Sequence, residues 1–66
     1  MKYTLIIGDV KESKDIKKGI TINHILEEID LPLETVVVKK NGRIVIEEEE
    51  ISHGDVIEII RVIYGG

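Results

Sequence analysis

The sequence predicts a single α+β domain in which one short helix packs across a mixed β-sheet. The chain has only 66 residues, enough for one domain with one hydrophobic core. Its hydrophobic share of 42% is nearly all Ile, Val and Leu, and β-branched side chains favour strands. One segment, however, has its apolar residues at helical spacing, so a helix interrupts the strands.

The first strand and its turn come from residues 1–10. Apolar and polar residues alternate there, with Tyr3, Leu5 and Ile7 on one face. Gly8 and Asp9 begin a polar turn that we expect to continue through residues 11–14. A second strand is expected at residues 15–20, and it would complete a hairpin.

The helix is expected to begin after Thr21, whose hydroxyl can cap an unpaired amide of the first turn. The apolar residues that follow recur at i, i+3, i+4 and i+7, as Ile22, Ile25, Leu26 and Ile29. The intervening polar residues, His24, Glu27 and Glu28, should face water. Pro32 restricts the residue before it and cannot donate a helical hydrogen bond, so the helix should end near Asp30.

Three more strands are expected in the second half of the chain, at residues 34–40, 43–46 and 56–63. Asn41-Gly42 joins the first two, because a type I′ hairpin turn needs positive φ at both central residues. Residues 47–50 are four consecutive glutamates, which repel one another and should form a solvated acidic edge rather than a cation site. Residues 52–55 read as a turn.

The resulting order is ββ-α-ββ with a long return to the last strand. A helix this short is unstable alone in water and must bury its apolar stripe on the sheet. We therefore expect the β-grasp, or ubiquitin-like, fold over residues 1–66.

Composition and charge exclude several classes of function. A net charge of −4 disfavours a general nucleic-acid binder, which needs a basic face. Without a signal peptide or an apolar run near 18 residues, we expect no membrane contact and a soluble, cytoplasmic protein that is a monomer by itself. The two histidines lack metal-ligand spacing, and neither a nucleophile–base set nor a Gly-rich phosphate loop is apparent. We expect no bound metal or cofactor and no enzymatic activity of the chain's own.

The candidate functional group is the α-carboxylate of Gly66, on a flexible tail with Gly65. Two terminal glycines also occur as a frayed end, but these directly follow a strongly apolar strand. A backbone without side chains can thread a narrow channel. The ionised carboxylate is a weak nucleophile until a partner holds it against the α-phosphate of ATP with Mg²⁺. Attack would give an acyl-adenylate that can accept sulfur or an amine, so the chain would be a co-substrate.

The last strand should also carry a docking surface. Period-two alternation sends Ile57 and Ile59 into the core and places Glu58 on the wet face. The residues on the face of Glu58 that lead to the tail are Ile60, Val62 and Tyr64. Exposed apolar groups usually mark partner sites, although neighbouring loops could cover these residues. Arg61 lies on the opposite side, where it could snorkel to the surface or pair with an acid of the partner.

Several of these segments resemble the ThiS/MoaD family of ubiquitin-like sulfur carriers. Residues 41–45, followed by residues 54–66 with their final Gly-Gly, look like the C-terminal half of that family, and residues 21–29 are similar to its helix. The resemblance covers about the last two thirds of the chain. It is closest to the small archaeal modifier proteins and the Urm1-like branch.

The resemblance implies a β-grasp fold and a C-terminal glycine adenylated by a ubiquitin-activating-type enzyme. In ThiS and MoaD the glycine then becomes a thiocarboxylate for thiamin or molybdopterin synthesis, with a sulfur donor and a sulfur-accepting synthase as further partners. The archaeal relatives supply sulfur for tRNA thiolation and form isopeptide bonds to lysines. By this resemblance Gly66 is the activated residue, Gly65 is its threading neighbour, and Ile60 and Val62 are docking positions.

Three hypotheses stay open from the sequence. The chain is a sulfur carrier, a protein modifier joined through Gly66 to lysines, or a non-covalent interaction module with an incidental tail. The first two share the fold, the tail and the activation step.

Overall fold

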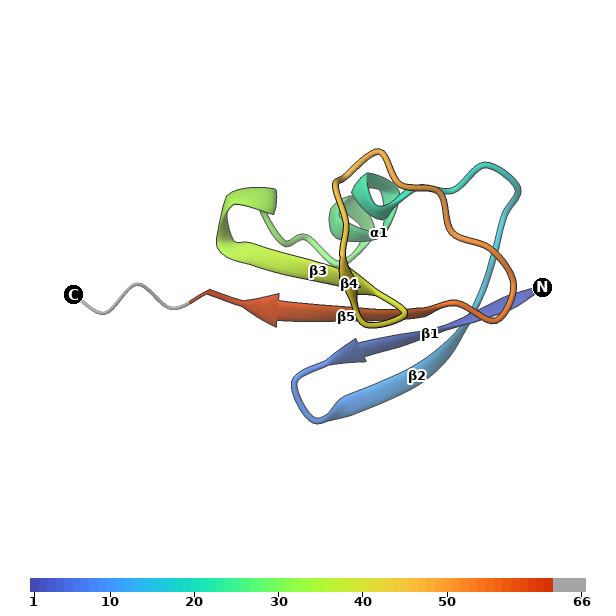
Figure 1. Ribbon diagram of the computed structural model, residues 1–66, viewed down its shortest axis with the longest axis horizontal. Coiled ribbons are helices and arrows are strands. Elements are labelled where there is room, and N and C mark those ends of the chain that lie inside the picture. The colour runs from blue at the N-terminus through green and yellow to red at the C-terminus, as the bar shows by residue number, and fades with distance from the viewer. Residues whose placement is uncertain (63–66) are drawn as a thin grey trace.

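The computed structural model describes residues 1–62, which form one helix packed on one face of a five-stranded sheet (Figure 1). In chain order the elements are β1 (Lys2–Ile7), β2 (Val10–Asp15), α1 (Ile22–Glu28), a 3₁₀ turn η1 (Leu33–Thr35), β3 (Val36–Lys40), β4 (Arg43–Ile44) and β5 (Val56–Arg61). The strand order in the sheet is β2-β1-β5-β3-β4. β5 pairs parallel with β1 and antiparallel with β3, so the sheet is mixed, and the predicted architecture is confirmed.

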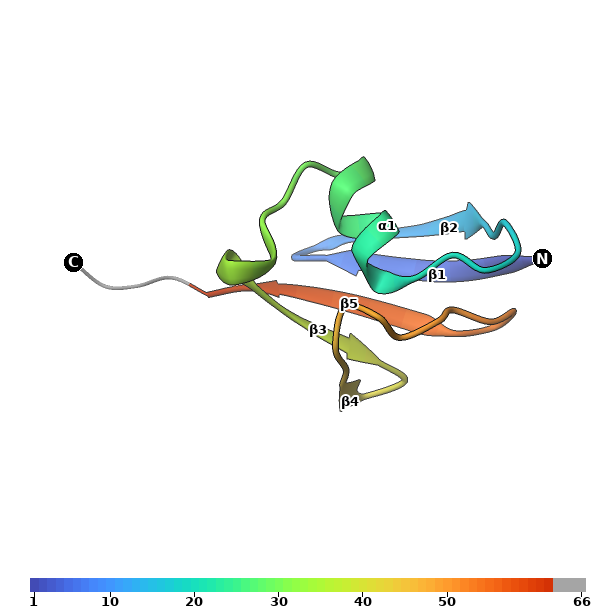
Figure 2. The ribbon, with the colours of Figure 1, turned by 90° about the horizontal axis from the view of Figure 1, so that it is seen from above.

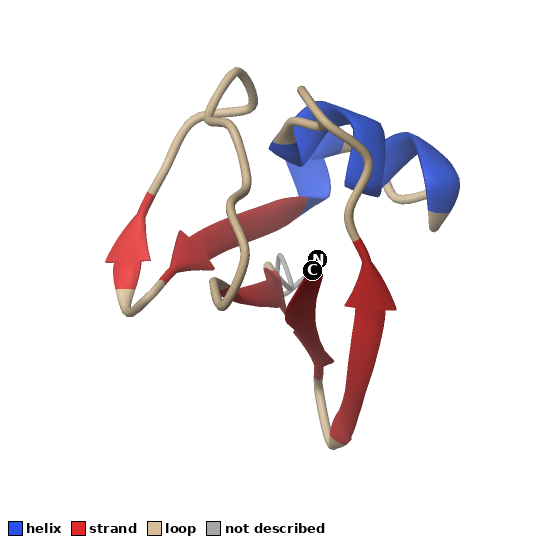
Figure 3. Ribbon diagram, turned by 90° about the vertical axis from the view of Figure 1, so that its right-hand side faces the viewer, coloured by secondary structure: helices blue, strands red, loops and turns tan. Residues whose placement is uncertain are grey.

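The core lies between α1 and the sheet, as the two rotated views show (Figures 2 and 3). Its buried residues come from α1, three strands and the loop before β5: Tyr3, Leu5, Ile22, Ile25, Leu26, Val36, Val38, Ile51, Ile57 and Ile59. The predicted alternation in β1 and the predicted helical stripe are both confirmed. Ile7 and Ile29, which the patterns also assigned to the core side, are half-buried and pack against it.

The second strand was predicted in the wrong place. Gly8 and Asp9 form a tight turn by themselves, and β2 begins at Val10, where a continuing turn was expected. Gly8 has φ of 58° while Asp9 has no positive φ, as in a two-residue type II′ hairpin. β2 is an edge strand with exposed residues, and charged side chains suit such an edge. Residues 16–20, predicted as strand, form a loop whose Ile16 and Ile20 pack against the core.

The helix is held at both ends by identifiable contacts. At its start His24 Nδ1 accepts a hydrogen bond from the Thr21 backbone N–H at 3.0 Å, in the manner of a capping box. At its end Asp30 has φ of 60°, and the Leu31 amide donates to the Leu26 carbonyl, which is a Schellman motif. His24 is exposed as expected, but it has a structural role that the sequence did not indicate.

The glutamate run is more than the solvated edge that was expected. The Glu47 and Glu49 carbonyls accept hydrogen bonds from the first two helical amides, those of Asn23 and Ile22, at 2.9 and 3.0 Å. Glu49 Oε2 also lies 2.6 Å from Lys40 Nζ. Both glutamates are half-buried, because their loop crosses back beside the start of α1 (Figure 1).

The three other strands are shorter than predicted. Residues 34 and 35, predicted as the start of a strand, belong to η1 instead, because the Thr35 amide and hydroxyl both bond to the Pro32 carbonyl. β4 ends at Ile44 rather than at residue 46, although the Val45 amide still donates to the Val38 carbonyl at 3.0 Å. β5 ends at Arg61, and Ile63 lies outside the described residues.

The turn between β3 and β4 is tied to the beginning of β5. Asn41 and Gly42 have φ of 53° and 85°, the predicted type I′ geometry. The Asn41 side chain accepts from the Val56 amide at 2.9 Å and donates to Asp55 Oδ1 at 3.0 Å. Asp55 Oδ2 accepts from the Ser52 amide at 2.8 Å. One side chain therefore joins the hairpin to the turn that begins β5.

Replacing Asn41 by glycine should therefore destabilise the fold. Glycine keeps the positive φ but loses both side-chain hydrogen bonds, so we expect a loss of about 1–2 kcal/mol in the free energy of unfolding. Urea denaturation measures the change. Ser13→Ala, on the exposed strand β2, is the control and should change stability by less than about 0.5 kcal/mol. An unchanged unfolding midpoint for Asn41→Gly would show that the contacts to Asp55 and Val56 contribute nothing.

Asp55 should make stability depend on acidic pH. Partial burial raises the pKa of its carboxyl, but hydrogen bonds from Ser52 and Asn41, together with the nearby Lys40 ammonium, hold the pKa below its usual value. A depressed pKa in the folded state contributes stability that is present above the unfolded pKa of about 3.9 and is lost as pH falls through the folded pKa.

The check is to compare the wild type with Asp55→Asn from neutral pH down to acid unfolding. The wild type should be the more stable protein near pH 7, and its advantage should shrink below about pH 4. Asp15→Asn, which removes a largely exposed pair with Lys2, should cost less than about 1 kcal/mol. An advantage that stays constant across this range would contradict the role assigned to the Asp55 carboxylate.

Candidate functional site

The candidate site is the end of β5, the strand that leads to Gly65 and Gly66. β5 is the central strand of the sheet, with β1 on one side and β3 on the other. Its Ile57 and Ile59 expose 0% and 1% of their surface, which confirms the predicted core positions. The last described residues before the tail are therefore anchored by two fully buried side chains.

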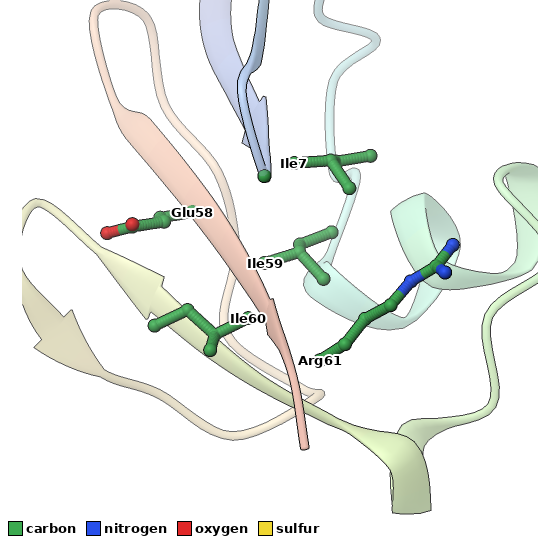
Figure 4. A pocket seen from close by; sticks show the side chains of 6 residues that line it. Ile7, Glu58, Ile59, Ile60 and Arg61 are labelled. Atoms are coloured by element: carbon green, nitrogen blue, oxygen red, sulfur yellow. The ribbon is translucent and has the colours of Figure 1, made fainter. Parts of the chain in front are cut away.

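The two faces of this strand end present different chemistry. Glu58 and Ile60 point to the open face of the sheet, while Ile59 and Arg61 point to the helix side (Figure 4). Ile60 is 38% exposed, as the alternation predicted. Arg61 is exposed and forms no ion pair within residues 1–62.

Ile60 belongs to a larger apolar surface, which we name the open-face patch and define as Val37, Ile44, Ile46 and Ile60. Val37 lies directly opposite Ile60 in the β3–β5 ladder. Val45 packs against the core, so Ile44 and Ile46 on either side of it face outward, and they are 72% and 65% exposed. Clustered aliphatic side chains with this exposure are typical of partner surfaces.

The sequence indicated only part of this patch. Ile60 was found from the alternation in β5, whereas Ile44 and Ile46 were assigned simply to a returning strand. The available signal was the uninterrupted run Ile44-Val45-Ile46 in an antiparallel hairpin, where a single helix can cover only one face of the sheet.

The other predicted site residues are placed as follows. Val62 is half-buried, and its amide donates to the Thr35 carbonyl of η1 at 2.9 Å. Tyr64, Gly65 and Gly66 lie outside the described residues. Docking at Ile60, Val62, Tyr64 and Arg61 stays a prediction.

A hollow of about 590 Å³ lies beside the end of β5 (Figure 4). It is lined by the turn that ends β1 and by the last residues of β5: Ile7, Gly8, Glu58, Ile59, Ile60 and Arg61. It exists because β1 turns away at Gly8 whereas β5 continues to Arg61. Side chains from both faces of the end of β5 therefore line the same hollow.

Both histidines have structural partners. His53 Nδ1 accepts from the Lys2 amide at 3.0 Å, as His24 Nδ1 does from Thr21. In the described part of the chain, no three His, Cys, Asp or Glu side chains lie close enough to hold a metal ion. Nor is any helix of residues 1–62 long and apolar enough to span a bilayer.

Comparison with known families decides the assignment. The model of the ThiS family matches residues 4–66, which is nearly the whole chain and includes both glycines of the tail. The chain belongs to the ThiS family. The resemblance noted from residues 21–29, 41–45 and 54–66 is thereby confirmed.

Solved structures agree on the fold of this ThiS-family protein. SAMP1 from Haloferax volcanii is similar over 100% of both chains, with a TM-score of 0.77 and 16% identity. A protein named Caldiarchaeum subterraneum ubiquitin aligns with a TM-score of 0.70 and 19% identity over 100% of this chain and 98% of its own. A ubiquitin-like protein from the same archaeon gives 0.67 and 17%, over 98% and 100%. At these identities the likeness establishes the ubiquitin-like β-grasp fold.

Family and fold together support the predicted class, a ubiquitin-like sulfur carrier or modifier. Small proteins of this kind are generally not enzymes themselves, and membership implies interaction with activating enzymes.

Proposed function

We propose that this protein is a sulfur carrier whose Gly66 α-carboxylate is adenylated by a ubiquitin-activating-type enzyme and then converted to a thiocarboxylate. The thiocarboxylate would deliver sulfur to thiamin or molybdopterin synthesis or to tRNA thiolation. One observation carries the proposal: the ThiS family match continues through Gly65 and Gly66, the residues that the sequence assigned to activation.

All catalytic groups of the proposed reaction belong to a partner enzyme. A carboxylate oxygen of Gly66 attacks the α-phosphorus of ATP, the bond to the β-phosphate breaks, and pyrophosphate leaves. Mg²⁺ and cationic groups of the partner offset the charge on the phosphates. Hydrosulfide-level sulfur, supplied by a sulfur donor, then attacks the acyl carbon and AMP leaves. ATP and Mg²⁺ are thus bound by the enzyme, and this chain is its co-substrate.

The chain's own contribution is to position the carboxylate. Ile57 and Ile59 hold β5 in the core, so the strand end cannot shift without breaking buried contacts. The open-face patch gives a partner an apolar surface close to the tail. Arg61 on the helix side offers an acidic group of the partner a cation on the other face of the same strand. Docking on both faces would orient Gly65 and Gly66 toward the nucleotide.

Intact-mass spectrometry tests the chemistry. The protein is incubated with the adenylating enzyme of its own organism, ATP, Mg²⁺ and a sulfide source. We expect the mass increase of one oxygen replaced by one sulfur, located at Gly66 by fragmentation. A variant lacking Gly66 is the control and should show no increase. An adenylated wild type that never gains sulfur would exclude the sulfur carrier.

The open-face patch should contribute to recognition by the enzyme. Ile44→Asp and Ile60→Thr should each lower kcat/KM for adenylation about tenfold or more, because each removes apolar area from the proposed contact. The loss should lie in KM, since docking away from the reacting atoms stabilises ground and transition states alike.

Val10→Asp is the matched control for the patch. Val10 is also an exposed aliphatic residue, at 56%, but it lies on the edge strand β2, away from the patch. It should leave kcat/KM unchanged, and all three variants should keep the wild-type melting temperature within a few degrees. Equal effects of Val10→Asp and Ile44→Asp would remove the patch from the proposal.

A second candidate is a protein modifier joined through Gly66 to lysines of target proteins. The likeness to proteins named ubiquitin and SAMP1 favours keeping it, because the same acyl-adenylate can pass its carbonyl to an amine. After chymotrypsin cleavage at Tyr64 it would leave diglycine remnants on cellular lysines, and these should disappear when Gly66 is deleted. A cellular phenotype that survives this deletion would instead favour a non-covalent interaction module.

A further inference from the structure

β5 extends beyond its neighbour β1 and so has one open edge. The parallel pairing of β1 with β5 ends at Ile7 opposite Ile59, where β1 turns away at Gly8. On the other side, the pairing with β3 continues to Val36 opposite Arg61. Among residues 1–62, the end of β5 therefore has a neighbouring strand on one side only.

The register shows which backbone groups face this open edge. The Val62 amide donates to the Thr35 carbonyl, and the Val56 carbonyl accepts from the Asn41 amide, so these even-numbered residues bond toward β3. Successive residues of a strand direct their N–H and C=O groups to opposite sides. The N–H and C=O of Arg61 consequently point away from β3, toward the side that β1 has left.

That side opens into the hollow beside the strand end (Figure 4). Its volume of about 590 Å³ exceeds what a few side chains occupy, and Gly8 forms part of its wall. A Cβ placed on Gly8 would meet nothing within 4 Å, so the space beside Gly8 is free of other atoms. An extended backbone can therefore approach Arg61 from the position that a longer β1 would occupy.

We propose that the adenylating partner adds an extended segment to this edge of β5, pairing with the backbone of Arg61. This inference rests on the proposed function and specifies how the tail is held. Gly65 and Gly66 offer no side chains, so a partner can hold these two residues only through their main chain. Strand addition supplies such contacts, and here it would begin just before residues 63–66.

The other two edges of the sheet are poor templates for strand addition. β2 carries charged residues along its length, and β4 contains only two residues. Both features discourage edge-to-edge pairing. The edge at Arg61 is also short and charged, but it continues a strand that is paired on its other side, and its side chains, Ile60 and Arg61, match a partner with apolar and acidic groups.

Amide hydrogen exchange followed by NMR tests the pairing. In the free protein the Arg61 amide should exchange much faster than the Val62 amide, which is bonded to Thr35. On addition of the adenylating enzyme of the same organism with ATP and Mg²⁺, the Arg61 amide should slow at least about tenfold, as expected for one added hydrogen bond. An enzyme that binds and adenylates the protein without slowing the Arg61 amide would overturn strand addition and leave the proposed function standing.

Two further outcomes of this experiment would also overturn strand addition by the enzyme. A wild-type protein that neither binds this enzyme nor is adenylated by it would overturn the proposed function and this inference together. Protection of the Arg61 amide in the free protein that grows with concentration would show a second copy on the edge, and would overturn the assignment to the enzyme.

Matched variants separate the backbone from the side chain. Arg61→Pro removes the N–H, and proline is tolerated where a strand has no partner on that side. Arg61→Ala removes only the side chain. We expect Arg61→Pro to bind the enzyme about tenfold more weakly than Arg61→Ala, with little change in melting temperature. Val62→Pro, which breaks the bond to Thr35, should lower the melting temperature. Equal binding by the first two variants would overturn the proposal.

Discussion

Pairing of β5 on both of its sides is the constraint on which the rest of the structure depends. The strand lies between β1 and β3, and Ile57 and Ile59 are fully buried beneath the helix. Because side chains alternate strictly, these two positions commit Glu58 and Ile60 to the opposite face. The segment that leads to the tail is therefore held rigidly, and its outward chemistry follows from its inward packing.

The loop between β4 and β5 connects this central strand to the other elements. Its backbone carbonyls accept the first amides of α1, a seven-residue helix that could not persist alone. Its Glu49 pairs with Lys40 of β3, and its Asp55 bonds to the Asn41 turn. A stretch rich in carboxylates thus supports the helix and the hairpin through main-chain and side-chain contacts together.

The accuracy of the sequence-based predictions depended on the range of the interactions. The helix, the Asn41-Gly42 turn and the inward face of β5 follow from rules that act within a few residues, and all three were predicted correctly. The position of β2 was not, because its polar residues fit a turn as well as an exposed edge strand. Ile44 and Ile46 were missed as surface residues because their exposure depends on which face of the sheet the helix covers.

The sequence by itself determined the ubiquitin-like fold class, the buried face of β5 and the Gly65-Gly66 candidate, because periodicity and turn chemistry are local properties. Only the tertiary structure decided that β5 continues past the end of β1 and leaves the Arg61 edge open. It also decided that the glutamate carbonyls hold the helix and that β4 completes the open-face patch. The physical reason is that an edge, a hollow or a patch forms where segments far apart in the chain meet or fail to meet. A local sequence pattern carries no information about how such segments are arranged in space.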